Sequence, residues 1–179
     1  VNNSYEVILD KYFEYDQVIF NKIYVLRNKI NTTKDLKIHS NEIEEVERLI
    51  TIFHAKVADT FSKKYKIDLI GFHGHTIFHN PNKKITKQIG NAKLLSQLTK
   101  KNIIFDFRSN DIKNGGQGAP LAPLFHLALS KKNKIIPPWL ILNIGGISNI
   151  TFCGKNPNDY RAMDIGPGNC LIDNWIRIN

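Results

Sequence analysis

Cysteine is scarce in this sequence. Only Cys153 and Cys170 occur among 179 residues, and neither belongs to a Cys-x-x-Cys pair. Two separated thiols exclude a disulfide framework and a zinc site built from thiolates alone. A protein with so few thiols needs no oxidising environment, so we expect it in the reducing cytoplasm.

Long apolar runs are also missing. The most apolar stretches, residues 103–105 and 140–142, have the length of strands, whereas a helix that crosses a bilayer needs about 20 apolar residues. The first residues carry no basic segment followed by an apolar one, which argues against a secretory signal. We therefore expect no membrane partner. The sequence does not begin with Met, and we expect a partial or processed chain.

Acidic residues are outnumbered, since 16 Asp and Glu face 25 Lys and Arg, for a formal net charge of +9. The lysine pairs, such as Lys63–Lys64 and Lys100–Lys101, are scattered at the ends of segments. A protein that reads nucleic acid more usually gathers arginines on one face with aromatic residues between them. The composition therefore predicts no nucleic-acid partner, but it favours attraction of small anions.

A core of ordinary size is available, because 42% of the residues are hydrophobic and only 23% are charged. Disorder is excluded as the default, and the length fits one domain or two small ones. Apolar residues at three- and four-residue steps predict one helix or two short helices within residues 5–30. The same spacing predicts a helix over residues 43–61, with Asn41 and Glu44 as a loose capping box.

After residue 65, short apolar runs alternate with helical stretches. The runs are residues 67–72, 103–105, 140–144, 147–152 and 160–163, and the helical stretches are about 91–100, 119–130 and 168–178. This alternation predicts an α/β protein. Polar clusters close the runs, and ligands of open α/β sheets bind beyond the carboxyl ends of strands, so we expect one shared site. The charged and proline-containing seam of residues 131–138 is the expected boundary between two lobes.

The spacing His73-x-His75-x-x-x-His79 admits a metal site, because residues two apart on a strand share a face and two imidazoles can hold one ion. Residues 69–105 contain no acidic residue before the aspartate at 106, which leaves such a site short of carboxylate ligands. The other interpretations are a structural or substrate-binding role for at least one of these histidines, or histidines of a solvated loop.

A second cluster places Asp106, Arg108 and Asp111 beside a glycine-rich turn at residues 114–118 that includes Gln117. Glycines let the backbone approach a ligand closely, and an arginine fork suits a carboxylate or phosphate. The spacing is neither that of a Walker loop nor that of a dinucleotide fingerprint. A capped turn with a local Asp106–Arg108 ion pair is the alternative.

Two further turns follow predicted strands. Gly145 and Gly146 predict a tight hairpin in a left-handed turn, with exposed amides that could hold an anion. Asp164 closes a strand and is followed by a Gly-Pro-Gly turn into a helix. Its carboxylate could serve as a general base, and the amides of the turn could bind an anion. An ordinary hairpin turn and an N-cap aspartate are the alternatives.

These clusters together resemble the anhydro-N-acetylmuramic acid kinase family. The blocks that carry the resemblance span about residues 67–179 and are Gly71-Phe-His-Gly-His-Thr76, Gln88-Ile-Gly-Asn91, Asp106-Phe-Arg108 to Asp111, Gly115-Gly-Gln-Gly-Ala-Pro120, Leu142-Asn-Ile-Gly-Gly-Ile-Ser-Asn149 and Asp164-Ile-Gly-Pro-Gly-Asn169. The resemblance implies the actin-like, sugar-kinase (ribonuclease H-like) ATPase fold in incomplete form. Residues 1–136 would be the first, sugar-binding lobe without its N-terminal phosphate loop, and residues 137–179 the start of the second, nucleotide-binding lobe.

The resemblance also implies a reaction. With ATP and Mg²⁺, 1,6-anhydro-N-acetylmuramic acid would be opened by water and phosphorylated on its 6-oxygen, which gives N-acetylmuramic acid 6-phosphate in peptidoglycan recycling. Asp164 takes the place of the catalytic aspartate. Chemistry and position add the remaining candidates, which are His73, Arg108, Asp111 and Gln117 for the sugar and Gly145, Gly146, Asn149, Gly166 and Gly168 for the nucleotide phosphates. No resident metal site is expected, and a homodimer is left open.

The sequence departs from the family in several ways. The Gly-Thr-Ser-x-Asp-Gly phosphate loop does not occur, most of the second lobe would lie beyond Asn179, and His75 stands where many relatives have Gln. We therefore expect this chain alone to be an inactive part of a cytoplasmic kinase. A metal-dependent hydrolase of the His-x-His type and a non-catalytic sugar-binding domain are the alternative functions.

Overall fold

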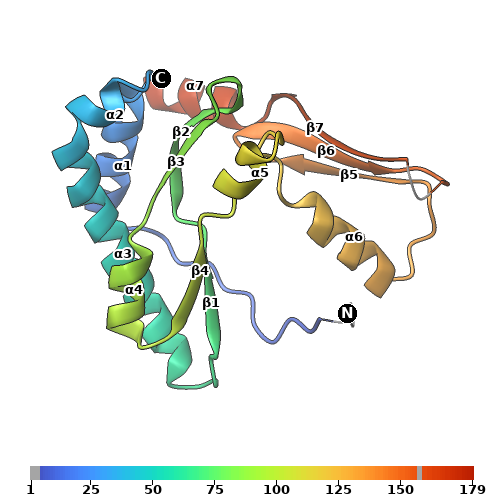
Figure 1. Cartoon of the computed structure of the whole chain (residues 1–179), viewed down its shortest axis with the longest axis horizontal. Coiled ribbons are helices and arrows are strands. Elements are labelled where there is room, and N and C mark those ends of the chain that lie inside the picture. The colour runs from blue at the N-terminus through green and yellow to red at the C-terminus, as the bar shows by residue number, and fades with distance from the viewer. Residues whose placement is uncertain (1–4, 157–158) are drawn as a thin grey trace. The chain divides into compact units, whose positions relative to one another are not determined.

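A computed structural model describes residues 5–156 and 159–179 of the chain (Figure 1). The fold is mixed α/β, as expected. The chain forms two compact units. Residues 11–118 make up what we call the N-terminal unit, and the described residues of 1–10 and 119–179 make up the C-terminal unit. The proposed lobe boundary near residue 136 stays a prediction.

The N-terminal unit begins with helices. Helix α1 spans Gln17–Lys29, α2 spans Asp35–Ile38, and α3 spans Ser40–Ser62. Helix α1 begins at residue 17 because the side chain of Asp16 accepts the amide of Ile19 at 2.8 Å and so caps it. The expected helical stretch from residue 5 is therefore wrong over residues 5–16, which form neither helix nor strand.

Helix α3 confirms the prediction for residues 43–61, but not the capping box. The helix already begins at Ser40, and the imidazole of the N-cap residue, His39, contacts the Glu42 carboxylate at 3.0 Å. Its apolar stripe packs against that of α1, and both belong to the core of the unit. Leu26 and Ile50 are almost fully buried, and each such side chain contributes about 1.5–3 kcal/mol by leaving water.

The strands of the N-terminal unit form two small sheets. Strand β1 (Leu69–Phe72) pairs in parallel with β4 (Asn102–Phe105), with Phe72 opposite Phe105. Strands β2 (His75–Asn80) and β3 (Ile85–Ile89) form an antiparallel hairpin around the 3₁₀ turn η1 (Pro81–Lys83). Helix α4 (Ala92–Thr99) precedes β4, and the short helix α5 (Ser109–Lys113) follows it. The hairpin and α5 were not predicted.

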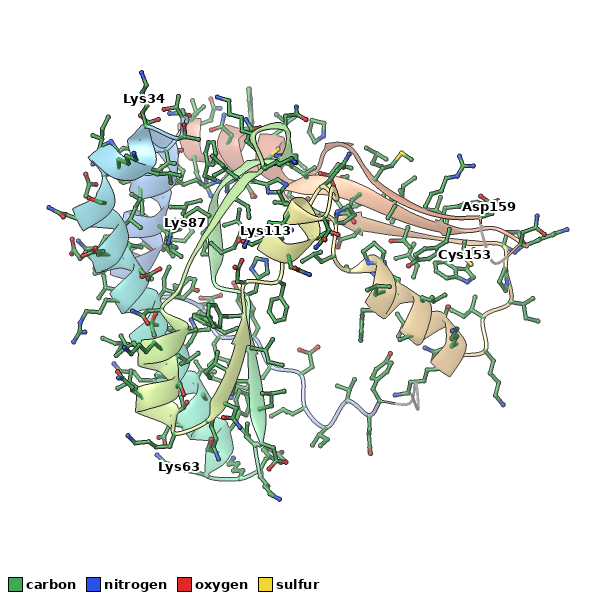
Figure 2. The ribbon with its side chains drawn as sticks, viewed as in Figure 1. Lys34, Lys63, Lys87, Lys113, Cys153 and Asp159 are labelled. Carbon is green, nitrogen blue, oxygen red and sulfur yellow. The ribbon has the colours of Figure 1, made fainter. Side chains whose placement is uncertain are left out.

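Positive charge in this unit is spread over its elements. Figure 2 labels Lys34 before α2, Lys63 after α3, Lys87 on β3 and Lys113 at the end of α5. These four lysines therefore do not share one helix or one strand.

The C-terminal unit is built around a three-stranded antiparallel sheet in the order β5-β6-β7. Its elements are α6 (Pro123–Lys132), β5 (Trp139–Ile144), β6 (Ile147–Cys153), β7 (Tyr160–Pro167) and α7 (Cys170–Ile178). Helix α6 is bonded to the sheet, because His126 meets Thr151 Oγ1 at 2.8 Å and the Tyr160 hydroxyl donates to the carbonyl of Pro123. Among the described residues, no helix has both the length and the apolar character that crossing a membrane requires.

Candidate active site

His73 and Arg108 meet at the carboxyl edge of the parallel strand pair. His73 is the first residue after β1, and Arg108 lies in the loop between β4 and α5. Because Phe72 and Phe105 are opposite each other, both loops leave the sheet on the same side. The Nε of Arg108 donates to Nε2 of His73 at 3.0 Å, and its Nη1 donates to the carbonyl of Gly118 at 2.5 Å. The structure thus brings together two of the predicted sugar-binding residues.

This contact fixes the role of one ring nitrogen of His73. A guanidinium can only donate, so Nε2 of His73 must accept. Its Nδ1 lies 3.0 Å from the carbonyl oxygen of Gly74, which fits an N–H donor at that position. The lone pair of Nε2 that a metal would need is therefore already used by Arg108.

The neighbouring His75 lies half-buried on β2. Burial lowers the pKa of its imidazole below the ordinary value, and the nearby charges of Arg27 and His73 lower it further. His75 therefore stays neutral at neutral pH.

Asp111 holds the glycine-rich turn. Its Oδ2 accepts the amide of Gly118 at 2.7 Å, and its own carbonyl accepts the amide of Gly116 at 2.8 Å. Gly118 has a φ of +68°, and a Cβ there would press on the side chain of Ile112. Asp111 on α5 thus holds the turn that carries the exposed Gln117, and one of its carboxylate oxygens is used for this structural role.

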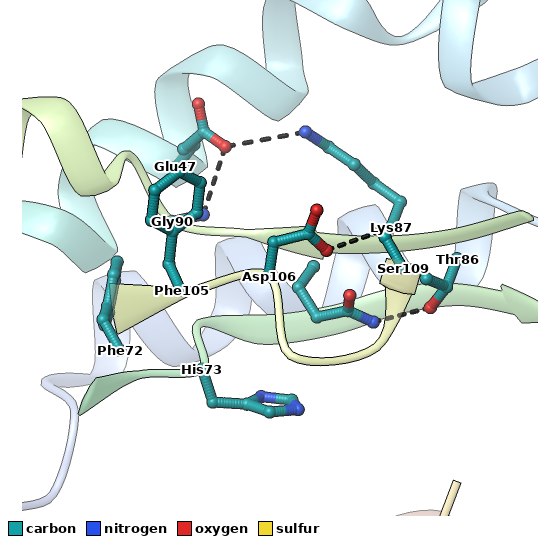
Figure 3. A pocket seen from close by; sticks show the side chains of 10 residues that line it. Glu47, Phe72, His73, Thr86, Lys87, Gly90, Phe105, Asp106 and Ser109 are labelled. Carbon is teal, nitrogen blue, oxygen red and sulfur yellow. Dashed lines mark hydrogen bonds and ion pairs between the residues drawn. The ribbon is translucent and has the colours of Figure 1, made fainter. Parts of the chain in front are cut away.

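A cavity of about 250 Å³ opens beside this edge, between α3, β3 and the loop after β4 (Figure 3). His73 lines it, together with Asp106 and Ser109 of that loop. Glu47 on α3 lines the far side, where its Oε1 accepts the amide of Gly90 at 3.1 Å and lies 3.7 Å from Lys87 Nζ.

Sequence reasoning missed the contribution of α3. Glu47 and Thr51 stand one turn apart and hold two successive amides, since the Thr51 hydroxyl accepts the amide of Asn91 at 2.9 Å. Thr51 is fully buried. The sequence offered one signal for this site, which is that Gly90 and Asn91 belong to one of the family blocks. Nothing in the residue pattern of α3 indicates that this helix contacts them.

In the C-terminal unit, the two predicted glycine turns are bonded to each other. The amide of Gly168 donates to the carbonyl of Gly146 at 3.0 Å, and the amide of Asn169 donates to that of Gly145 at 2.7 Å. The amide of Cys170 also points to Gly146, at 3.3 Å. The amides of the turn into α7, up to that of Cys170, therefore contact the hairpin turn rather than standing open for an anion.

The expected left-handed turn at Gly145 and Gly146 is wrong, because neither has a positive φ. Glycine is needed for close approach at Gly168 instead, since a Cβ on Gly168 would collide with the carbonyl oxygen of Gly145. The open positions are Gly146 and Gly166, where a Cβ would meet nothing within 4 Å.

Asp164 lies on β7 opposite Asn149 of β6. The register shifts just beyond this pair, so that Ile165 is the extra residue before Gly166, which has a φ of +148°. Such bulges re-aim side chains and are frequent beside active sites. Asp164 is exposed, and its carboxylate has no hydrogen-bond or ion-pair partner among residues 5–156 and 159–179.

The predicted residues thus form two groups, each assembled within its own unit. His73, Arg108, Asp111 and Gln117 belong to the N-terminal unit. The C-terminal unit contains Asp164 and the phosphate candidates Gly145, Gly146, Asn149, Gly166 and Gly168. The chain is a mixed α/β protein, and its candidate residue His73 lies directly after a strand.

Comparison with known proteins identifies the family. Residues 11–179 match the family model of anhydro-N-acetylmuramic acid kinase, and the chain belongs to this family. A protein named anhydro-N-acetylmuramic acid kinase from Pelagibacter ubique is 56% identical over 178 residues, which cover 98% of this chain and 48% of that protein. One of the same name from Agrobacterium fabrum is 39% identical over 175 residues, which cover 92% of this chain and 46% of that protein. The chain spans about half the length of these relatives.

Proposed function

We propose that this chain supplies the sugar-binding residues and the catalytic aspartate of an ATP-dependent kinase. The kinase opens 1,6-anhydro-N-acetylmuramic acid and phosphorylates its 6-oxygen in cytoplasmic recycling of peptidoglycan. The observation that carries the proposal is Asp164, an exposed carboxylate without a partner in the described chain, at a bulge of β7 in a member of this family. The actin-like two-lobed arrangement, with residues 137–179 in the second lobe, is part of the proposal.

Asp164 acts as the general base. It takes a proton from a water molecule, and the oxygen of that water bonds to the anomeric carbon while the bond from this carbon to the 6-oxygen breaks. A carboxylate that activates water on the face opposite the leaving oxygen is the arrangement of an inverting glycosidase. One aspartate suffices because the released 6-oxygen is itself the nucleophile toward phosphorus.

The residues of the C-terminal unit fit a nucleotide in part. Gly146 and Gly166 border open space, which would let phosphate oxygens approach the backbone. Bound MgATP supplies the phosphoryl group that is transferred to the sugar. Asn149, opposite Asp164, is the further polar candidate at this place.

The N-terminal unit holds the sugar. Arg108, fixed by His73 and Gly118, provides a positive charge for the lactyl carboxylate. His73, the turn held by Asp111 and the exposed Gln117 contribute contacts to the sugar. A metal-dependent hydrolase would need His73 as a ligand, and its Nε2 already accepts from Arg108.

A chimera tests the proposal. The matching segment of the Pelagibacter ubique relative is replaced by this chain, and ATP-dependent formation of N-acetylmuramic acid 6-phosphate is measured. We expect product from the chimera and none from the 179-residue chain alone. A chimera that folds and binds the sugar without forming product would overturn the proposal and favour a non-catalytic sugar-binding domain. Product from the 179-residue chain alone would contradict the expectation that this chain needs the rest of the kinase for activity.

A further inference from the structure

The cavity of the N-terminal unit has a lining whose charge selects among ligands. Two carboxylates, those of Glu47 and Asp106, face it together with one ammonium group, that of Lys87. Figure 3 shows Lys87 reaching toward Glu47, and Lys87 Nζ lies 3.7 Å from Glu47 Oε1. The carboxylates in the lining thus outnumber its ammonium group by two to one. A phosphate or another anion is therefore disfavoured in this cavity.

Asp106 is the acceptor best placed for a ligand. Its φ of +57° lies in the left-handed region, which few residues other than glycine adopt and which often marks functional sites. Ser109 Oγ donates to Asp106 Oδ1 at 2.5 Å and so fixes the carboxylate, and in Figure 3 the second carboxylate oxygen points away from Ser109. A carboxylate oriented in this way can accept hydrogen bonds from hydroxyl groups.

An aromatic wall completes the cavity. Phe72 is buried and Phe105 is 58% exposed, and both line it at the ends of paired strands. An aromatic surface next to fixed acceptors suits a ring that has apolar C–H groups on its faces and hydroxyls around its edge. The volume of about 250 Å³ is that of one small ring compound rather than a nucleotide.

We infer that this cavity binds the uncharged, hydroxyl-bearing side of an amino sugar, with Asp106 accepting hydrogen bonds from its hydroxyls. The inference rests on the proposed function for the identity of the sugar. It also gives the sugar an orientation, because His73 lines the cavity and bonds to Arg108. A carboxylate on the sugar would point out of the negative cavity toward Arg108.

The test uses the 179-residue protein without ATP. Binding of N-acetylglucosamine, which is uncharged, and of inorganic phosphate is followed by NMR through the backbone amides of Gly90 and Ser109. The variants are Asp106→Asn, which keeps the shape of the side chain and removes its charge, and Asp68→Asn as a matched control on an exposed aspartate of the same unit. Lys87→Met provides a second variant of the lining.

We expect N-acetylglucosamine to shift both amides, at least tenfold weaker binding in Asp106→Asn, and unchanged binding in Asp68→Asn. If Asp106→Asn does not fold, Lys87→Met takes its place: we expect unchanged binding of the uncharged N-acetylglucosamine and still weaker binding of phosphate, because the lining becomes more negative. Absence of sugar binding, equal affinity in Asp106→Asn, or preferential binding of phosphate overturns the inference. If the chain binds the sugar but the chimera forms no product, the proposed kinase activity is wrong and the proposed sugar site stands. If the chimera forms product and Asp106→Asn does not change the amount, the proposed sugar site is wrong and the kinase activity stands.

Discussion

The backbone amide of Gly168 donates to the carbonyl oxygen of Gly146 at 3.0 Å, which ties the turn after β7 to the turn between β5 and β6. The bond places Gly168, which follows Asp164 in the chain, against the hairpin turn. The close approach depends on the absence of side chains. The geometry around Asp164 is thus built from backbone contacts of the C-terminal unit.

Gly168→Ala tests this close approach. The new Cβ would collide with the carbonyl oxygen of Gly145, so the turn must open, and we expect the free energy of unfolding to fall by about 1–3 kcal/mol. Gly146→Ala is the matched control, because a Cβ there meets nothing within 4 Å. Urea denaturation measures both variants. Equal stability of the two would show that the turns are not in contact.

Thr51→Val tests the attachment of α3 to the loop after β3. Valine keeps the shape of the side chain but leaves the amide of Asn91 without its acceptor, which costs about 1–3 kcal/mol for a buried group. Thr60 lies on the exposed side of the same helix and bonds only to the carbonyl of Lys56, so Thr60→Val should change stability by less than about 0.5 kcal/mol. If Thr60→Val lowers stability and Thr51→Val does not, the hydrogen bond from the Asn91 amide to Thr51 does not attach α3 to this loop.

His75 should make stability depend on pH. Its pKa is lower in the folded chain than the ordinary value of about 6.5, so the unfolded chain binds the proton first. Stability is therefore full above about pH 6.5 and falls as the pH drops below that value. We expect His75→Gln to remove part of this fall between about pH 6.5 and pH 5, with no effect on the slope between about pH 7 and pH 8. Identical pH profiles of the two proteins would reject the role of His75.

Arg108→Lys should weaken binding of a sugar that carries a carboxylate but not of a sugar without one. Lysine keeps the positive charge but lacks the planar fork that bonds both His73 and Gly118. We expect N-acetylmuramic acid, which carries a carboxylate, to bind about tenfold more weakly, by about 1.4 kcal/mol, whereas N-acetylglucosamine should keep its affinity. Calorimetric titration measures both ligands. An equal loss for both sugars would mean that Arg108 only supports the fold.

Local patterns in the sequence predicted much of this fold. The apolar spacing in residues 43–61 gives α3, and the short runs give β1, β4, β5, β6 and β7 because apolar strands closed by turn residues have a clear signature. The hairpin of β2 and β3 was not predicted, because its histidines, lysines and threonines do not alternate with apolar residues. The helix proposed from residue 5 failed because Asp16 caps a later start.

The candidate site was predicted in its residue types but not in its contacts. That His73 and Arg108 belong to one place follows from parallel pairing of β1 and β4. The sequence could not reveal that Glu47 and Thr51 hold the amides of Gly90 and Asn91, since these contacts depend on tertiary packing of α3. Nor could it show that glycine is required at Gly168 for close approach rather than at Gly145 for a left-handed turn, because glycine permits both.

The most direct measurement is the turnover number of the chimera with Asp164→Asn, compared with Asp173→Asn on α7 as a matched control. General base catalysis contributes about 10²–10⁴-fold to a rate. We predict that Asp164→Asn lowers kcat by this factor with KM for the sugar largely unchanged, and that Asp173→Asn leaves kcat unchanged. A kcat for Asp164→Asn within about twofold of the unsubstituted chimera would contradict the central claim that Asp164 activates the attacking water.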